Sequence, residues 1–100
     1  MLLSETWRRY KVDKQLEGYS KYTLQSYGLQ SRLFIDHAGD VPITEVTYEM
    51  IKDYLAGHAE RLKPSTIAAR MKYFKSVFKW AHEEGIITSN PAARLREPKM

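Results

Sequence analysis

The sequence contains no cysteine, which excludes disulfide bridges, thiolate zinc sites and cysteine nucleophiles. It has only five glycines, and they form no glycine-rich phosphate loop. No apolar run approaches the roughly 20 residues that cross a bilayer, and the first residues lack the basic and apolar regions of a secretory signal. From these absences we expect a cytoplasmic protein with no membrane partner.

Acidic residues are missing from one long segment. Residues 61–81 contain no Asp or Glu, whereas the whole chain of 100 residues carries a net charge of +4. The basic residues of this segment are Arg61, Lys63, Arg70, Lys72, Lys75 and Lys79. Such a segment attracts phosphate, although a solvated helix face would give the same pattern.

The apolar residues recur with helical spacing, and no stretch alternates for long enough to predict a strand. With 43% apolar and 28% charged residues, the chain has the composition of a globular domain. We predict an all-α fold, a compact bundle of four main helices at about residues 5–17, 21–38, 48–59 and 64–84. The predicted N-caps are Ser4, Ser20 and Thr47, with Pro64 in the first turn of the fourth helix and Gly18, Gly39 and Gly85 as stops.

Each predicted helix has an apolar stripe that we expect to be buried. The four stripes are Trp7, Tyr10 and Leu16; Leu24, Tyr27, Phe34, Ile35 and Ala38; Met50, Ile51, Tyr54 and Leu55; and Ile67, Met71, Phe74, Phe78 and Ala81. Gly28 inside the second helix costs about 1 kcal/mol relative to alanine. Either it permits another backbone to approach or it has no role in packing. Residues 86–87 are expected to fold back on the core.

Two predicted helix starts resemble each other, at residues 19–24 and 62–67. Each places a lysine and hydroxyls at the positive end of a helix dipole, where phosphate oxygens bind readily. Helix capping alone would also explain the hydroxyls. Two copies, the second opening a basic helix, favour DNA as the partner.

Small polar residues flank the stripes of the second and fourth helices, as in a helix that enters a major groove. On the second helix the flanking residues are Thr23, Ser26 and Gln30. On the fourth they are Thr66, Ala69, Tyr73, Ser76 and Trp80, and only those near the N-terminal half are small or polar. The lysines at 72, 75 and 79 form a separate row suited to phosphates. Arg70 is placed to reach a base edge or phosphate, or to pair with a buried carboxylate.

Catalysis has little support in the sequence. The three histidines, at positions 37, 58 and 82, lack metal-ligand spacing. No pair of carboxylates has the pattern of a general acid and base, and most tyrosines fall on the core stripes. We expect no metal, no cofactor and no catalytic residue, so the chain alone is not an enzyme.

The order and spacing of several motifs resemble the N-terminal core-binding (SAM-like) domain of tyrosine recombinases, the phage-integrase and Xer group. The resemblance extends from about residue 6 to 93. It rests on residues 63–67 (KPSTI), 78–81 (FKWA), 84–87 (EGII) and 90–92 (NPA), and on Ser20, Thr23, Leu24, Tyr27 and Phe34. Ser31 departs from the family, which usually has a bulky apolar residue there.

The resemblance implies that residues 1–93 grip double-stranded DNA at a core recombination site through the second and fourth helices. Residues 94–100 would begin a linker to a C-terminal catalytic domain of the same parent recombinase, and other protomers would join it on DNA. The predicted DNA contacts are Ser20, Lys21, Thr23, Ser26, Lys63, Ser65, Thr66, Ala69, Arg70 and Tyr73. At Ala69 only a methyl contact is available, so phosphates would supply most of the affinity.

Two other functions fit the same pattern. A stand-alone helical DNA-binding regulator would share the charge distribution but should carry its own dimer interface. A SAM-like protein-interaction module would show no salt-dependent binding to duplex DNA.

Overall fold

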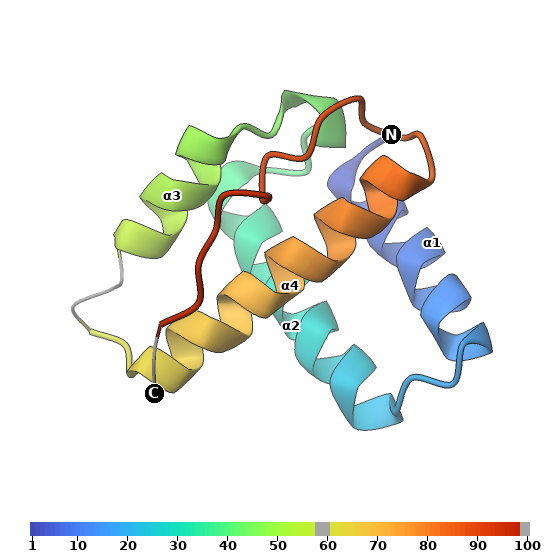
Figure 1. Ribbon diagram of the computed structural model, residues 1–100, viewed down its shortest axis with the longest axis horizontal. Helices are drawn as coiled ribbons and strands as arrows, with labels where there is room; N and C mark the ends of the chain where they lie inside the picture. The colour runs from blue at the N-terminus through green and yellow to red at the C-terminus, as the bar shows by residue number, and fades with distance from the viewer. Residues whose placement is uncertain (58–60, 99–100) are drawn as a thin grey trace. The chain divides into compact units, whose positions relative to one another are not determined.

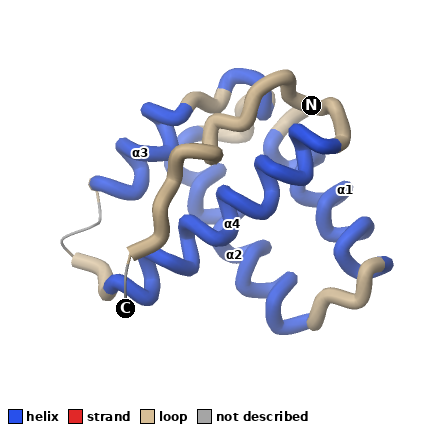
Figure 2. The backbone as a smooth tube through the Cα atoms, viewed as in Figure 1, coloured by secondary structure: helices blue, strands red, loops and turns tan. Residues whose placement is uncertain are grey.

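The computed structural model describes residues 1–57 and 61–98 of the chain. Across these residues the fold is all-α, as predicted, with four α-helices and one short 3-10 turn (Figure 2). The elements are α1 (Leu3–Leu16), α2 (Lys21–Ala38), η1 (Ile43–Glu45), α3 (Tyr48–Ala56) and α4 (Pro64–Glu83). They fall into two units, one formed by Met1–Glu45 and one that begins at Val46.

In the first unit, α1 and α2 contact each other and are joined by a short turn (Figure 1). Gly18 in this turn has φ 88°, the left-handed conformation predicted for the residue after a helix end. Tyr10 is fully buried, with its ring centroid 5.7 Å from that of Trp7 and 6.5 Å from that of Tyr27. A Cβ atom at Gly28 would lie 3.1 Å from the Trp7 ring. Gly28 therefore makes room for an aromatic side chain, whereas the sequence suggested a backbone.

The start of α1 differs from the prediction. The helix begins at Leu3, so Ser4 lies inside it and is not the cap. The Leu3 N–H donates to the Val41 carbonyl at 3.0 Å, and Ser4 instead donates to Asp40, through its N–H at 2.9 Å and its hydroxyl at 2.5 Å. These partners are nearly 40 residues away in sequence, beyond the reach of a local capping rule. Leu16 was predicted to be buried but is 83% exposed.

In the second unit, the ends of the helices agree closely with the prediction. The Thr47 hydroxyl accepts a hydrogen bond from the Met50 N–H at 3.2 Å and caps α3. This helix ends at Ala56, and its predicted end at Ala59 lies outside the described residues. Pro64 occupies the first turn of α4, and Gly85 follows the helix with φ 75°.

Aromatic rings form much of the core of the second unit. Phe74 is 1% exposed, and its ring centroid lies 6.0 Å from Tyr54, 5.1 Å from Tyr73 and 6.1 Å from Phe78. Several residues of the predicted stripes in both units are only half-buried: Trp7, Tyr27, Ile35, Ala38, Met50, Ile67 and Met71.

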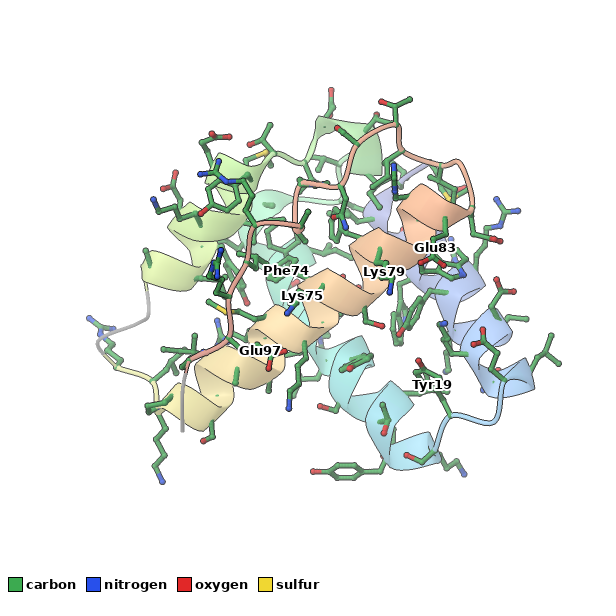
Figure 3. The ribbon with its side chains drawn as sticks, in the orientation of Figure 1. Tyr19, Phe74, Lys75, Lys79, Glu83 and Glu97 are labelled. Carbon is green, nitrogen blue, oxygen red and sulfur yellow. The ribbon has the colours of Figure 1, made fainter. Side chains whose placement is uncertain are left out.

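The segment after α4 runs back along that helix (Figure 1). Ile87 and Leu95 are buried, as expected for a chain that folds back on the core. The Lys75 ammonium lies 4.0 Å from a carboxylate oxygen of Glu97, and the two side chains meet beside α4 (Figure 3). Packing in this unit therefore extends to at least residue 97. The domain boundary at residue 93 stays a prediction.

Candidate nucleic-acid interface

The N-terminus of α2 is capped by its own side chains. The Ser20 hydroxyl oxygen accepts a hydrogen bond from the Thr23 N–H at 3.1 Å, and its O–H donates to the Thr23 hydroxyl oxygen at 2.8 Å. Both hydroxyls thus have a structural role, which was one of the two explanations open from sequence. Lys21 is exposed beside them, and Ser26 is half-buried one turn further on.

The N-terminus of α4 has no such cap. Lys63 occupies the N-cap position and makes no side-chain capping hydrogen bond. Its carbonyl accepts from the N–H groups of Thr66 and Ile67 at 3.0 and 3.1 Å. The side chains of Lys63 and Ser65 are exposed, and Thr66 is half-buried. The positive end of this helix dipole therefore combines a lysine with a hydroxyl that is not used for capping, a suitable arrangement for an anion.

The exposed side of α4 carries the predicted lysine row. Lys72, Lys75 and Lys79 are all exposed. Lys75 and Lys79 each have a carboxylate oxygen at 4.0 Å, from Glu97 and Glu83 respectively (Figure 3). Among the described residues no carboxylate lies within 4 Å of Lys63 or Lys72. The charges of Lys63 and Lys72 are therefore more available to an outside anion than those of Lys75 and Lys79.

Arg70 faces the opposite side of α4 from Lys72, because two residues correspond to about 200° around a helix. Its guanidinium donates to the Tyr54 hydroxyl at 3.0 Å and lies 5.2 Å from the centroid of the same ring. Within the described part of the chain it contacts no carboxylate, and its Nε is buried without an acceptor. Burial raises the pKa of Tyr54 above its usual value, and the charge of Arg70 partly opposes this shift. This bond favours a packing role for Arg70 over a DNA contact.

Three residues that the sequence placed at the margin of the stripes are part of the core. Tyr73 is 2% exposed and Trp80 is 7% exposed. Gln30 on α2 is also buried. The buried stripe of α4 is wider than predicted, so residues at its margin are covered. The ring of Tyr73 is therefore covered by neighbouring side chains, and its contact with DNA stays a prediction.

The outward side of α2 holds Ser26, a predicted DNA contact, together with Tyr22, Gln25 and Leu29, which were not predicted to contact DNA. Tyr22 is 79% exposed and Leu29 is 53% exposed, with Gln25 exposed and Ser26 half-buried between them. These positions are spaced i, i+3, i+4 and i+7, so they share one face of the helix. The signal was present in the sequence, because none of the residues at these positions belongs to the predicted apolar stripe.

A groove of about 890 Å³ lies elsewhere in the second unit. It is formed by α3, α4 and residues 93–96, and Leu55, Ile67, Met71 and Leu95 contribute apolar surface to it. Lys52, Arg94 and Arg96 also line it, and the Arg94 guanidinium lies 4.4 Å from the centroid of the Tyr48 ring. Neither Lys63 nor Ser65 lines this groove, so it is a separate surface.

The residues that the structure describes contain neither a cluster of metal ligands nor a helix suited to span a membrane. No group of three or more His, Asp or Glu side chains in this part of the chain is placed to hold a metal ion. None of the helices that the structure describes is both long and apolar enough to span a bilayer.

Comparison with known proteins identifies the family. The profile of the phage integrase central domain matches residues 4–98. The tyrosine recombinase XerC of Bifidobacterium longum (strain DJO10A) is 28% identical over 90 residues, which cover 87% of this chain and 25% of the relative. The chain thus spans about a quarter of the length of this recombinase.

Two solved structures have a similar fold. One is a lambda integrase(75-356) dimer bound to a COC′ core site, which is 25% identical and has a TM-score of 0.85, with 100% of this chain and 37% of that chain covered. The other, a lambda integrase dimer bound to a COC′ core site, is 24% identical with the same TM-score and 29% of its chain covered; this second likeness bears on the fold alone. Because the family profile covers nearly all of the sequence, the chain belongs to the phage integrase central domain family.

Proposed function

We propose that this chain is the core-site DNA-binding domain of a tyrosine recombinase that acts in site-specific recombination and integration. Residues 1–93 bind double-stranded DNA, and residues 94–100 begin the connection to a C-terminal catalytic domain of the same parent enzyme. The similar lambda integrase(75-356) structure is a dimer bound to a COC′ core site, which supports duplex DNA and further protomers as partners. The proposal includes a cytoplasmic location, where DNA lies in a bacterium such as the source of the similar recombinase.

The observation that carries this proposal is the first turn of α4. Its dipole is not capped by a side chain, Lys63 and Ser65 are exposed there, and Lys72 adds a second cation two turns on. On α2 the hydroxyls of Ser20 and Thr23 are used for capping, so Lys21 is the charged side chain that contacts phosphate there. Such groups bind phosphates and carry no sequence information themselves. Ser26, Thr66 and Ala69 are half-buried on the same two helices and make secondary contacts, whereas the bond to Tyr54 gives Arg70 an indirect role.

Salt dependence of DNA binding tests the proposal. For the 100-residue chain and a short duplex, a plot of log K against log[salt] should be linear with a negative slope. Lys63→Ala removes one phosphate contact and should flatten that slope by about 0.9. Lys52→Ala is the matched control, because it removes the same charge from the α3 groove and should leave the slope nearly unchanged.

Three results would count against the proposal. Absence of binding at low salt would contradict the DNA-binding function itself. Equal flattening by Lys63→Ala and Lys52→Ala would mean that net charge alone attracts the duplex. An unchanged slope for Lys63→Ala would remove the first turn of α4 from the interface.

A protein-interaction module is the second candidate function, and the α3 groove is the observation that favours it. Its apolar surface and the three cations around it would suit an apolar segment with acidic neighbours. That function requires no salt-dependent binding to DNA, so the same titration separates the two candidates.

A further inference from the structure

The outward face of α2 carries no charge over two turns, between Tyr22 and Leu29. Tyr22, Gln25, Ser26 and Leu29 occupy it, and the two large residues are 79% and 53% exposed. The core of this unit is formed from the other side of α2, where Leu24 and Phe34 are buried. The fold therefore does not need an exposed tyrosine and an exposed leucine at these positions.

We propose that, where α2 meets the major groove of DNA, its face formed by Tyr22, Gln25, Ser26 and Leu29 prefers A·T base pairs. The inference rests on the proposed DNA-binding function and goes beyond it, because phosphate contacts cannot distinguish one sequence from another. Residues 22 to 29 span about 10 Å along the helix axis. That length corresponds to about three base-pair steps.

The residue types on the face determine the preferred bases. A glutamine side chain forms paired hydrogen bonds with the N6 and N7 atoms of adenine, and Gln25 is exposed for such a contact. Apolar side chains contact the methyl group of thymine, which suits Leu29 and the ring of Tyr22. The face has no arginine or lysine for guanine and no carboxylate for cytosine.

Two cations at the margin of the uncharged face are consistent with that face meeting the bases. Lys21 and Arg32 are exposed and lie about 100° and 80° from Tyr22 around the helix, on the same side of the uncharged face. Cations at the margin can reach a phosphate strand while the uncharged face meets the bases. Both flanking cations are free of a carboxylate within 4 Å in the described part of the chain.

The test is to select preferred duplexes from a randomised pool with the 100-residue chain and then to measure Kd for defined variants of the selected site. We expect A·T pairs at about three neighbouring positions. Replacing the A·T pair whose adenine Gln25 contacts by G·C should weaken binding about tenfold or more, and Gln25→Ala should abolish most of that difference. Replacing thymine by uracil removes only the methyl group and should weaken binding about fourfold. The Leu29→Ala variant should no longer distinguish thymine from uracil.

Val12→Ala is the matched control, because Val12 is an aliphatic residue of α1 that is 54% exposed. This variant should leave the base preference unchanged. Salt-dependent binding without base preference, or a preference that Gln25→Ala and Leu29→Ala leave intact, would overturn the inference and leave the DNA-binding function standing. A loss of self-association in the Tyr22→Ser and Leu29→Ser variants, with base preference unchanged, would assign the face to a protein contact and also overturn it. Absence of all duplex binding would refute both.

Discussion

Replacement of Ser20 and of Ser65 by alanine should have different effects on stability, although both serines lie at the start of a long helix. The Ser20 hydroxyl accepts the Thr23 N–H at 3.1 Å and caps α2, and loss of such a cap costs about 1 kcal/mol. Its second bond, to the Thr23 hydroxyl, is exposed to water and adds little. Ser65 follows the N-cap of α4 and makes no capping bond. Its replacement should change stability by less than about 0.5 kcal/mol.

Thermal unfolding followed by circular dichroism measures both effects. For a domain of this size, about 1 kcal/mol corresponds to a decrease in Tm of about 4–8 °C, so Ser20→Ala should unfold several degrees below the parent chain and Ser65→Ala within about 3 °C of it. Ser65→Ala should instead weaken DNA binding by about tenfold or more, because a hydrogen bond to a charged phosphate is worth about 1.5–3 kcal/mol. Equal decreases in Tm for the two variants would refute the assignment of one serine to capping and the other to contact.

Three further substitutions test the packing and the ionisation of single groups. Ser31→Ala should raise stability by about 1 kcal/mol in urea unfolding, because the Ser31 hydroxyl is buried without a partner among the described residues; a decrease would show that the hydroxyl is bonded. Hydrogen bonds from Ser4 lower the pKa of Asp40, so the stabilising contribution of this carboxylate is present above about pH 4 and is lost as the pH falls through its lower folded-state pKa. Asp40→Asn should make the stability less dependent on pH in the acid range. An identical dependence of Tm on pH in both proteins would contradict this. Because the pKa of Tyr54 is raised, stability should decrease as the pH rises above about 10. Tyr54→Phe should remove this alkaline decrease while leaving Arg70 without its acceptor, at a loss of about 1–2 kcal/mol at neutral pH; an unchanged alkaline profile would refute it.

The helix bounds were predictable wherever strong local signals surround a helix. The limits of α2 were predicted correctly, because Ser20 and Gly39 are both unambiguous in sequence. The start of α1 was not predictable, because backbone bonds from Val41 and a side-chain partner at Asp40 fix it. Such long-range bonds leave no trace in a local pattern.

The candidate surface was predictable as a region but not residue by residue. The basic character of α4 and the hydroxyls at both helix starts were evident from sequence. Their roles were not, since only the structure distinguishes the capped start at Ser20 from the uncapped one at Lys63. The width of a buried stripe depends on the neighbouring helices, which is why Tyr73 and Gln30 were placed at its margin and are in fact buried.

A map of backbone amide chemical shifts across the whole chain, recorded during titration with a short duplex at low salt, tests the proposed DNA interface most directly. We expect the largest changes on residues 20–29 of α2 and on residues 63–72 of α4, and these changes should decrease together as salt is added. Changes concentrated at Lys52 and residues 93–96, or no chemical-shift change at any duplex concentration, would contradict the proposed DNA interface.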